Sequence, residues 1–161
     1  MTATTQIETP AGVPFVNMSR EFAAPRALVY RAFFEPDLLV QWLGPRKYRM
    51  TIETMEVRDG GRWRYTHHDD QGNAWSFHGV YHGTPTADGA VQTFEFDGAP
   101  GHVSLEQVTF EERDGRTVVR THSVFQSLEA RDAMVQAGMA EGVNDGYARL
   151  DELIERLAVA A

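Results

Sequence analysis

The 161-residue sequence contains no cysteine. This absence excludes disulfide bonds, thiolate metal sites and a cysteine nucleophile, and it is compatible with a reducing cytoplasm. No apolar run approaches the roughly 20 residues that a helix needs to span a bilayer. The first dozen residues have neither the basic nor the apolar segment of a signal peptide. We therefore expect a soluble, cytoplasmic protein with no membrane partner.

Positive charge is also scarce. The 15 Lys and Arg residues are outnumbered by 23 Asp and Glu residues, which gives a formal net charge of −8 at pH 7. Broad electrostatic attraction to nucleic acid is therefore not expected. The motifs of serine hydrolases, zinc proteases, phosphate loops and dinucleotide-binding folds are missing too. The sequence thus indicates no catalytic residue, no metal ligand and no cofactor.

The length and a hydrophobic content of 42% are those of an ordinary globular protein. A chain of about this size buries roughly two-thirds of the surface that its unfolded form exposes, so it needs no disulfide or metal to fold. Residues 1–13 are polar and predict a flexible tail, and residues 14–161 predict a single domain.

The middle of the chain predicts an antiparallel sheet. Segments rich in aromatic and β-branched residues alternate with turn sequences such as Asp59-Gly60-Gly61 and Asp114-Gly115, which favour sequential hairpins. In one segment Trp63, Tyr65 and His67 share a face. The predicted strands cover residues 14–22, 47–57, 62–69, 74–83, 91–97, 103–112 and 116–125.

Helices are predicted on either side of this sheet region. Two short helices begin near Pro25 and Pro36, and Gly44-Pro45 ends the second. Residues 128–137 predict another helix, and a long one runs from about Met139. The apolar face of the long helix comprises Met139, Val143, Tyr147, Leu150, Ile154 and Leu157.

These elements predict an α+β fold in the order β-α-α-β6-α, with about seven strands. A strongly curved sheet cannot bury its concave face on itself, so the long helix must fill that face. Because one helix is narrower than such a sheet, we expect an internal cavity beside it.

Several segments resemble a known family. They are Ala23-Ala24-Pro25-Arg26, Val29-Tyr30-Arg31-Ala32-Phe33, Gln41-Trp42-Leu43-Gly44-Pro45, Asp59 to Tyr65 and Phe77 to Tyr81. Over about residues 14–158 the chain is similar to the START-like (SRPBCC) superfamily, in the branch named for activators of the heat-shock-protein-90 ATPase. The resemblance implies a helix-grip fold with an internal cavity. It implies no single chemistry, because relatives include lipid carriers, hormone sensors, polyketide aromatase/cyclases and co-chaperone domains.

Large side chains of the strands and of the long helix are candidates to line the cavity. Aromatic rings offer extensive contact area, and tyrosine and tryptophan add a polar atom. The alternative for each of them is simply to fill the core. The candidates are Trp42, Trp63, Tyr65, Trp75, Phe77, Tyr81, Phe94, Phe96, Phe110, His122, Met139, Val143 and Tyr147.

Charged side chains within strands leave a choice open. Arg64, Arg120, His122 and Glu95 are either solvated on the convex face or turned into the cavity as a ligand anchor or general acid or base. Strand parity does not decide between these positions, because bulges shift the face.

Glycines recur every four residues at Gly138, Gly142 and Gly146. A glycine inside a helix costs about 1 kcal/mol relative to alanine, so this row suggests a close approach to that face. The approaching group is part of the same chain, a ligand or a second subunit. In an alternative reading, the helix begins only after Gly142.

The leading hypothesis is that the protein binds or carries a small hydrophobic molecule in its cavity. One alternative is a polyketide cyclase/aromatase-like enzyme in which His122, His78 or Tyr81 transfers protons. Another is a protein-interaction module that binds a chaperone or forms a homodimer, for which a large exposed apolar patch would be the sign.

Overall fold

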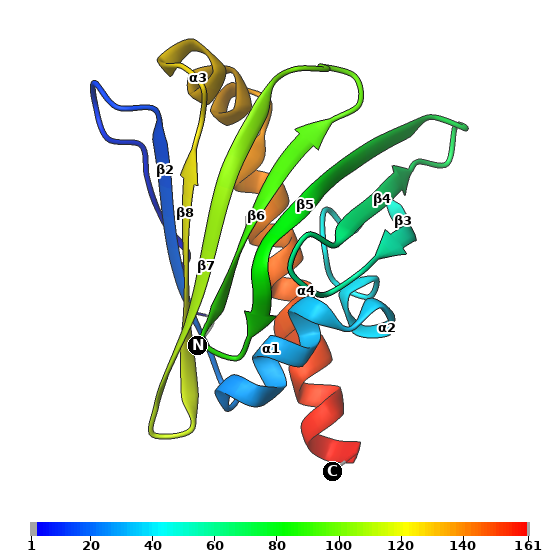
Figure 1. Cartoon of the computed structure of the whole chain (residues 1–161). Helices are drawn as coiled ribbons and strands as arrows, with labels where there is room; N and C mark the ends of the chain where they lie inside the picture. Colours follow the sequence, from blue (N-terminus) through cyan, green and yellow to red (C-terminus); the bar gives the residue numbers. More distant parts are fainter. Residues whose placement is uncertain (1–2, 161) are drawn as a thin grey trace.

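The computed structural model describes residues 3–160, which form one antiparallel sheet and four helices (Figure 1). The eight strands are ordered β1-β2-β8-β7-β6-β5-β4-β3. Their bounds are β1 (Gln6–Glu8), β2 (Phe15–Phe22), β3 (Arg49–Met55), β4 (Arg62–His68), β5 (Ala74–Thr86), β6 (Gly89–Phe96), β7 (Val103–Arg113) and β8 (Arg116–Val124). Sequential hairpins connect β3 through β8, as the turn sequences predict.

The helices lie on the concave side of the sheet. They are α1 (Arg26–Phe34), α2 (Pro36–Leu39), α3 (Leu128–Gln136) and α4 (Met139–Ala160). Figure 1 shows α4, in orange to red, running along the curved sheet, with α1 and α2 beside its lower half. The prediction of an α+β helix-grip fold is thus confirmed. No helix in residues 3–160 is long and apolar enough to cross a membrane.

The sheet has one more strand than the sequence predicts. Residues 6–8 lie in the segment assigned to a flexible tail, yet they form β1 and pair with β2 through Gln6–Ser19, Ile7–Met18 and Glu8–Asn17. A three-residue edge strand is held by backbone hydrogen bonds and carries too short an apolar alternation to be recognised. The tail assignment is therefore wrong for these residues.

The junction between α3 and α4 is fixed by two local signals. The hydroxyl of Ser127 caps α3 by accepting a hydrogen bond from the backbone N of Ala130, at 3.0 Å. Gly138 has φ +92°, a backbone conformation that favours glycine, and α4 begins at the next residue. The alternative in which the long helix starts after Gly142 is therefore wrong.

Close approach in the glycine row comes from the same chain. At Gly146, an added Cβ would lie 3.2 Å from the backbone N of Gly44 and 3.3 Å from the carbonyl oxygen of Trp42. At Gly142 the nearest atom would be a ring carbon of Pro45, at 3.7 Å. Gly146 thus lets α4 pack directly on the loop that follows α2.

A partly buried ion pair holds the other side of α4. Arg20 on β2 donates two hydrogen bonds to Asp151, with Nη1–Oδ1 at 2.7 Å and Nη2–Oδ2 at 2.5 Å. The Arg20 side chain is only 3% exposed, and its guanidinium lies 4.6 Å from the centre of the Phe22 ring. A two-pronged pair of this kind fixes geometry as well as charge, so it sets where α4 lies on the sheet.

Gly44 provides a test of the packing at the loop after α2. Its φ is +86°, and an added Cβ would lie 2.5 Å from Cε1 of His67. Gly72 has nearly the same φ, +87°, with no atom within 4 Å of the added Cβ. We expect Gly44→Ala to lower the free energy of unfolding by about 2 kcal/mol more than Gly72→Ala, because only Gly44→Ala adds overpacking to backbone strain.

Urea unfolding followed by circular dichroism measures both losses. Gly72→Ala is the matched control, because it measures the cost of placing alanine at a positive φ without any steric clash. Equal losses in the two variants would show that the His67 ring moves aside without cost.

Candidate functional site

The concave face, α1, α2 and the α3–α4 region enclose a cavity of about 310 Å³. This volume is at the lower end of the range for small-molecule sites. The apolar lining consists of Met18, Phe33, Phe34, Leu39, Trp42, Leu43, Ile52, Met55, Trp63, Tyr65, Tyr81, Phe94, Val108, Phe125, Met134, Met139 and Val143.

Many of the side chains selected from the sequence meet around this cavity. Those on its lining are Trp42, Trp63, Tyr65, Tyr81, Phe94, Met139 and Val143. Trp63 stacks on Tyr65 at a centroid distance of 5.3 Å and an interplanar angle of 19°. The ring centroid of Phe94, on β6, lies 5.8 Å from that of Trp63. Together these three rings form an aromatic wall on one side of the cavity.

The other predicted aromatic side chains lie outside the lining. Phe77 and Phe96 extend the layer of rings along the sheet, at a centroid distance of 5.1 Å, and Trp75 packs on Tyr48 at 5.2 Å. Phe110 and Tyr147 are buried in the core. These side chains therefore pack against other residues of the protein and do not line the cavity.

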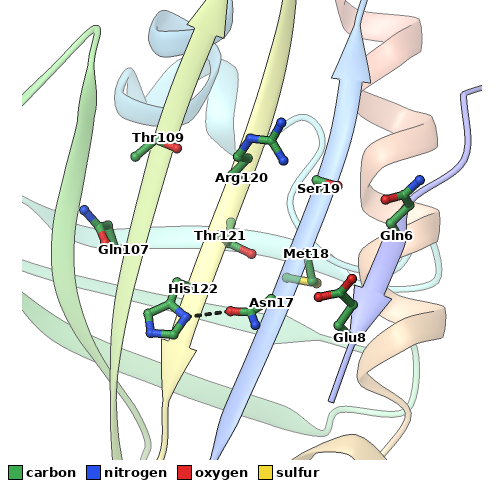
Figure 2. Close-up of a pocket in the computed structure, with 10 residues that line it drawn as sticks. All are labelled: Gln6, Glu8, Asn17, Met18, Ser19, Gln107, Thr109, Arg120, Thr121 and His122. Carbon is green, nitrogen blue, oxygen red and sulfur yellow. Dashed lines mark hydrogen bonds between the residues drawn. The ribbon is translucent and has the colours of Figure 1, made fainter. Parts of the chain in front are cut away.

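His122 is on the opposite face of the sheet from the cavity. It is paired with Asn17 of β2 in register, and its Nδ1 lies 2.6 Å from Oδ1 of Asn17 (Figure 2). The expectation that His122 faces the cavity is wrong. Both faces of β8 carry polar residues, inward at Thr121 and Ser123 and outward at Arg120 and His122, so alternation gave no direction.

A second hollow, of about 300 Å³, lies on this outer face (Figure 2). It is lined by Gln6, Glu8, Asn17, Met18, Ser19, Gln107, Thr109, Arg120, Thr121 and His122. Two of its polar groups already have partners, since His122 contacts Asn17 and Arg120 Nε donates to Glu111 at 3.3 Å. The internal cavity is the better candidate because its lining is largely apolar and it is partly enclosed by the helices.

The cavity contains one acidic side chain that the sequence analysis did not select, Glu106 of β7. In the register of the sheet it lies between Gln92 of β6 and Ser123 of β8, and all three side chains line the cavity. Gln92 Nε2 donates a hydrogen bond to Glu106 Oε1 at 3.3 Å. Within residues 3–160, Glu106 forms no ion pair. These three residues form a polar row in an otherwise mainly apolar cavity.

Burial raises the pKa of the Glu106 carboxyl from its ordinary value of 4.5 to about 7, and hydrogen bonds from Gln92 and Ser123 offset this only in part. Near neutral pH, both protonation states of Glu106 are therefore populated. Burial also raises the pKa of Tyr65, and the charge of Glu106 adds to that shift. Tyr65 and Glu106 line the same cavity, so the carboxyl group and the aromatic wall border one space.

The other charged strand residues selected from the sequence have their partners on the outer face of the sheet. Arg64 borders the cavity, but its Nη1 donates to Asp97 Oδ2 at 2.7 Å, and His78 Nδ1 contacts the same carboxylate at 2.7 Å. Glu95 lies beside His78, with 3.4 Å between Nε2 and Oε1. All six histidines fall within the described part of the chain, and none lines the cavity.

The model of the family described as "Activator of Hsp90 ATPase homolog 1-like protein" matches residues 23–155. The chain belongs to this family. The match confirms the resemblance found in the sequence, and membership in the Hsp90-activator-like family indicates a ligand-binding or chaperone-associated fold.

Solved structures of bacterial proteins share the fold of this Hsp90-activator-like chain. A Rhodobacter sphaeroides protein is 24% identical with a TM-score of 0.87, covering 95% of this chain and 99% of its own. A Mycobacterium smegmatis protein is 22% identical with a TM-score of 0.84, covering 94% and 96%. An Arthrobacter aurescens protein is 22% identical with a TM-score of 0.85, covering 94% and 91%. A search of curated proteins found no match.

The raised pKa of Glu106 predicts a measurable effect on stability. Because the folded state holds this proton more tightly than the unfolded state, Glu106 costs up to about 3 kcal/mol of stability as the pH rises from 4.5 to about 7. Glu106→Gln should abolish this loss. The stability of the variant relative to the wild-type protein should therefore increase across that pH range, as measured by urea unfolding at each pH.

His67 makes the comparison with the wild-type protein necessary. Burial, then the charges of Arg149 and His68, lower the pKa of His67 to about 4, so its contribution to stability is lost as the pH falls below about 6.5. This slope opposes that of Glu106 but is common to both proteins and cancels in the difference. Glu111→Gln, on the outer face of the same strand, is the matched control. A difference that does not vary with pH would contradict the prediction.

Proposed function

We propose that the protein binds a small hydrophobic molecule in its internal cavity. The observation that carries this proposal is a space of about 310 Å³ whose walls are mainly aromatic and aliphatic, with the polar row of Gln92, Glu106 and Ser123 on the sheet. An apolar occupant would gain roughly 25 cal/mol for each Å² of its surface removed from water. The polar row would then orient the occupant.

The α3–α4 junction supplies the adaptable part of the wall. Met134 and Met139 line the cavity on either side of Gly138, where the helix is interrupted. Methionine side chains are unbranched and fit varied shapes, so this wall suits ligands that differ in outline.

One observation favours proton transfer as a second candidate function. Glu106 is a titratable group that lines the cavity, and its pKa of about 7 suits a general acid or base at neutral pH. The version that relies on His122 or His78 has no support, because both lie on the outer face. Tyr81 lines the cavity and remains a candidate beside Glu106.

A protein-interaction role has less support. The exposed large hydrophobic residues of the described chain are Leu105, Leu128 and Val159, which belong to β7, α3 and α4. They do not indicate one contiguous apolar patch of the kind that marks a docking surface. A chaperone partner or a homodimer is thus a separate proposal, to which the cavity gives no support.

A cavity-filling variant tests the binding proposal. Val143 of α4 lines the cavity, and Val143→Phe would place an aromatic ring in the space that a ligand needs. We expect the neutral fluorescent probe N-phenyl-1-naphthylamine to bind the unmodified protein saturably and Val143→Phe at least about tenfold more weakly, a loss of about 1.4 kcal/mol.

Val159→Phe is the matched control, because Val159 lies on the same helix but is 87% exposed. It should leave probe affinity unchanged, with circular dichroism checking that both variants fold. Equal binding to all three proteins would place the probe outside the cavity and contradict the proposal.

A further inference from the structure

We infer that the cavity selects hydrophobic molecules that carry one protonated amine, with Glu106 as the ionic anchor and the aromatic wall as its second contact. This inference rests on the proposed function, since it names the chemical class of the ligand for the same cavity. It depends on charge balance inside the cavity, on the position of the carboxyl group and on the rings beside it.

The carboxyl group of Glu106 has no cationic partner within the described chain, because the arginines of the surrounding elements are engaged elsewhere. Arg20 is paired with Asp151, and Arg64 with Asp97 on the outer face. Arg149 of α4 donates to the carbonyl oxygens of Gly44 at 3.1 Å and Gln41 at 2.9 Å. Glu106 is half-buried on the cavity wall, and a carboxylate removed in part from water costs free energy unless a cation is paired with it. A cation supplied by the ligand would therefore complete the site.

The same carboxyl group disfavours anionic ligands. A fatty acid or other anion would bring a second negative charge beside Glu106, and two adjacent carboxylates cannot both ionise without a large cost. The polar row offers no positive side chain to offset that charge, because its other members are Gln92 and Ser123. Anionic hydrophobic molecules are therefore poor ligands for this cavity.

The aromatic wall offers a second contact for a cation. Trp63 and Tyr65 stack, Phe94 adjoins Trp63, and all three rings line the cavity that also contains Glu106. The faces of such rings attract cations, and the attraction is strongest where water is excluded. Only a cation gains from both the carboxylate and the rings, whereas an alcohol can hydrogen-bond to the carboxylate but gains no cation–π attraction.

The ionisable groups near Glu106 determine the pH at which the preference for amines should be tested. Gln92 and Ser123 on the flanking strands do not titrate. Tyr65 on β4 and Tyr147 on α4 both interact with the Glu106 charge, and burial raises the pKa of both phenols, which keeps them neutral. Arg20 on β2, which interacts with Tyr147, is already paired with Asp151. At about pH 8, Glu106 is thus largely ionised and an aliphatic amine is still protonated.

The test compares three ligands of one shape: 1-naphthylmethylamine, 1-naphthylmethanol and 1-naphthoate. Their affinities are measured at about pH 8 by displacement of N-phenyl-1-naphthylamine and by calorimetry. We expect the amine to bind at least about tenfold more tightly than the alcohol, and the carboxylate to bind more weakly than either. In Glu106→Gln the advantage of the amine over the alcohol should shrink to the part that the aromatic wall alone supplies, while the alcohol keeps its affinity. In Glu111→Gln both affinities should stay as in the unmodified protein.

A readout on the unmodified protein does not depend on how Glu106→Gln folds. At pH 7, binding of an ammonium should lower the pKa of Glu106 and release about half a proton per ligand, because roughly half of the carboxyl groups are protonated beforehand. Calorimetry in two buffers of different ionisation enthalpy measures this release. The alcohol should release none.

The outcomes separate this inference from the proposal on which it rests. If the alcohol binds and the amine binds no better, or if the advantage of the amine is undiminished in Glu106→Gln, the amine inference is overturned and the cavity remains a binding site. If neither the neutral probe nor any of the three naphthalene compounds binds, the proposed function itself fails. Preferential binding of the naphthoate would also overturn the inference.

Discussion

The structure depends on the difference in width between the curved sheet and the single long helix that covers it. The eight-stranded sheet curves around a concave face, and one long helix must cover that face although it is narrower than the sheet. Two contacts determine where α4 lies: the Arg20–Asp151 pair on the β2 side, and the direct approach of Gly146 to the loop after α2. With α4 fixed at both places, part of the concave face stays uncovered by the helix. The cavity is that remaining space.

The same geometry explains why a single carboxyl group dominates the chemistry of the cavity. Strand alternation turns Glu106 inward between Gln92 and Ser123, where its side chain is half-buried and no cation of the described chain is paired with it. A fold selected only for stability would place an apolar residue at such a position. Real proteins break local rules mostly at functional sites, so the cost of burying Glu106 is itself an argument for a role in recognition.

Local signals were enough to predict most of the fold. Pro36, Gly138 and the Asp-Gly turns act through their own backbone preferences, and each marks an element boundary in the structure. The apolar period of α4 likewise placed Met139 and Val143 toward the sheet. Such features depend on neighbours in sequence, which is why they can be read without coordinates.

The candidate site was only partly predictable, because the faces of its strands are chemically alike. On β7, Leu105 points outward and is 47% exposed while Glu106 points inward, the reverse of the usual pattern. Phe110, which is buried and shares the parity of Glu106, was the one signal in the strand that could have revealed this. On β8, His122 has polar neighbours on both faces, so its direction depended on the register with β2.

The Arg20–Asp151 pair also has a consequence for the order of folding. Its partners are 131 residues apart, so the contact that fixes α4 closes a loop that spans most of the chain. Contacts of such long range are slow to form, because the entropy of closing the loop must be lost before the contact can repay it. On a translating ribosome, the strands emerge well before α4 is available. Until α4 docks, the aromatic wall of the nascent sheet is exposed, and aggregation during synthesis is the hazard that this architecture carries.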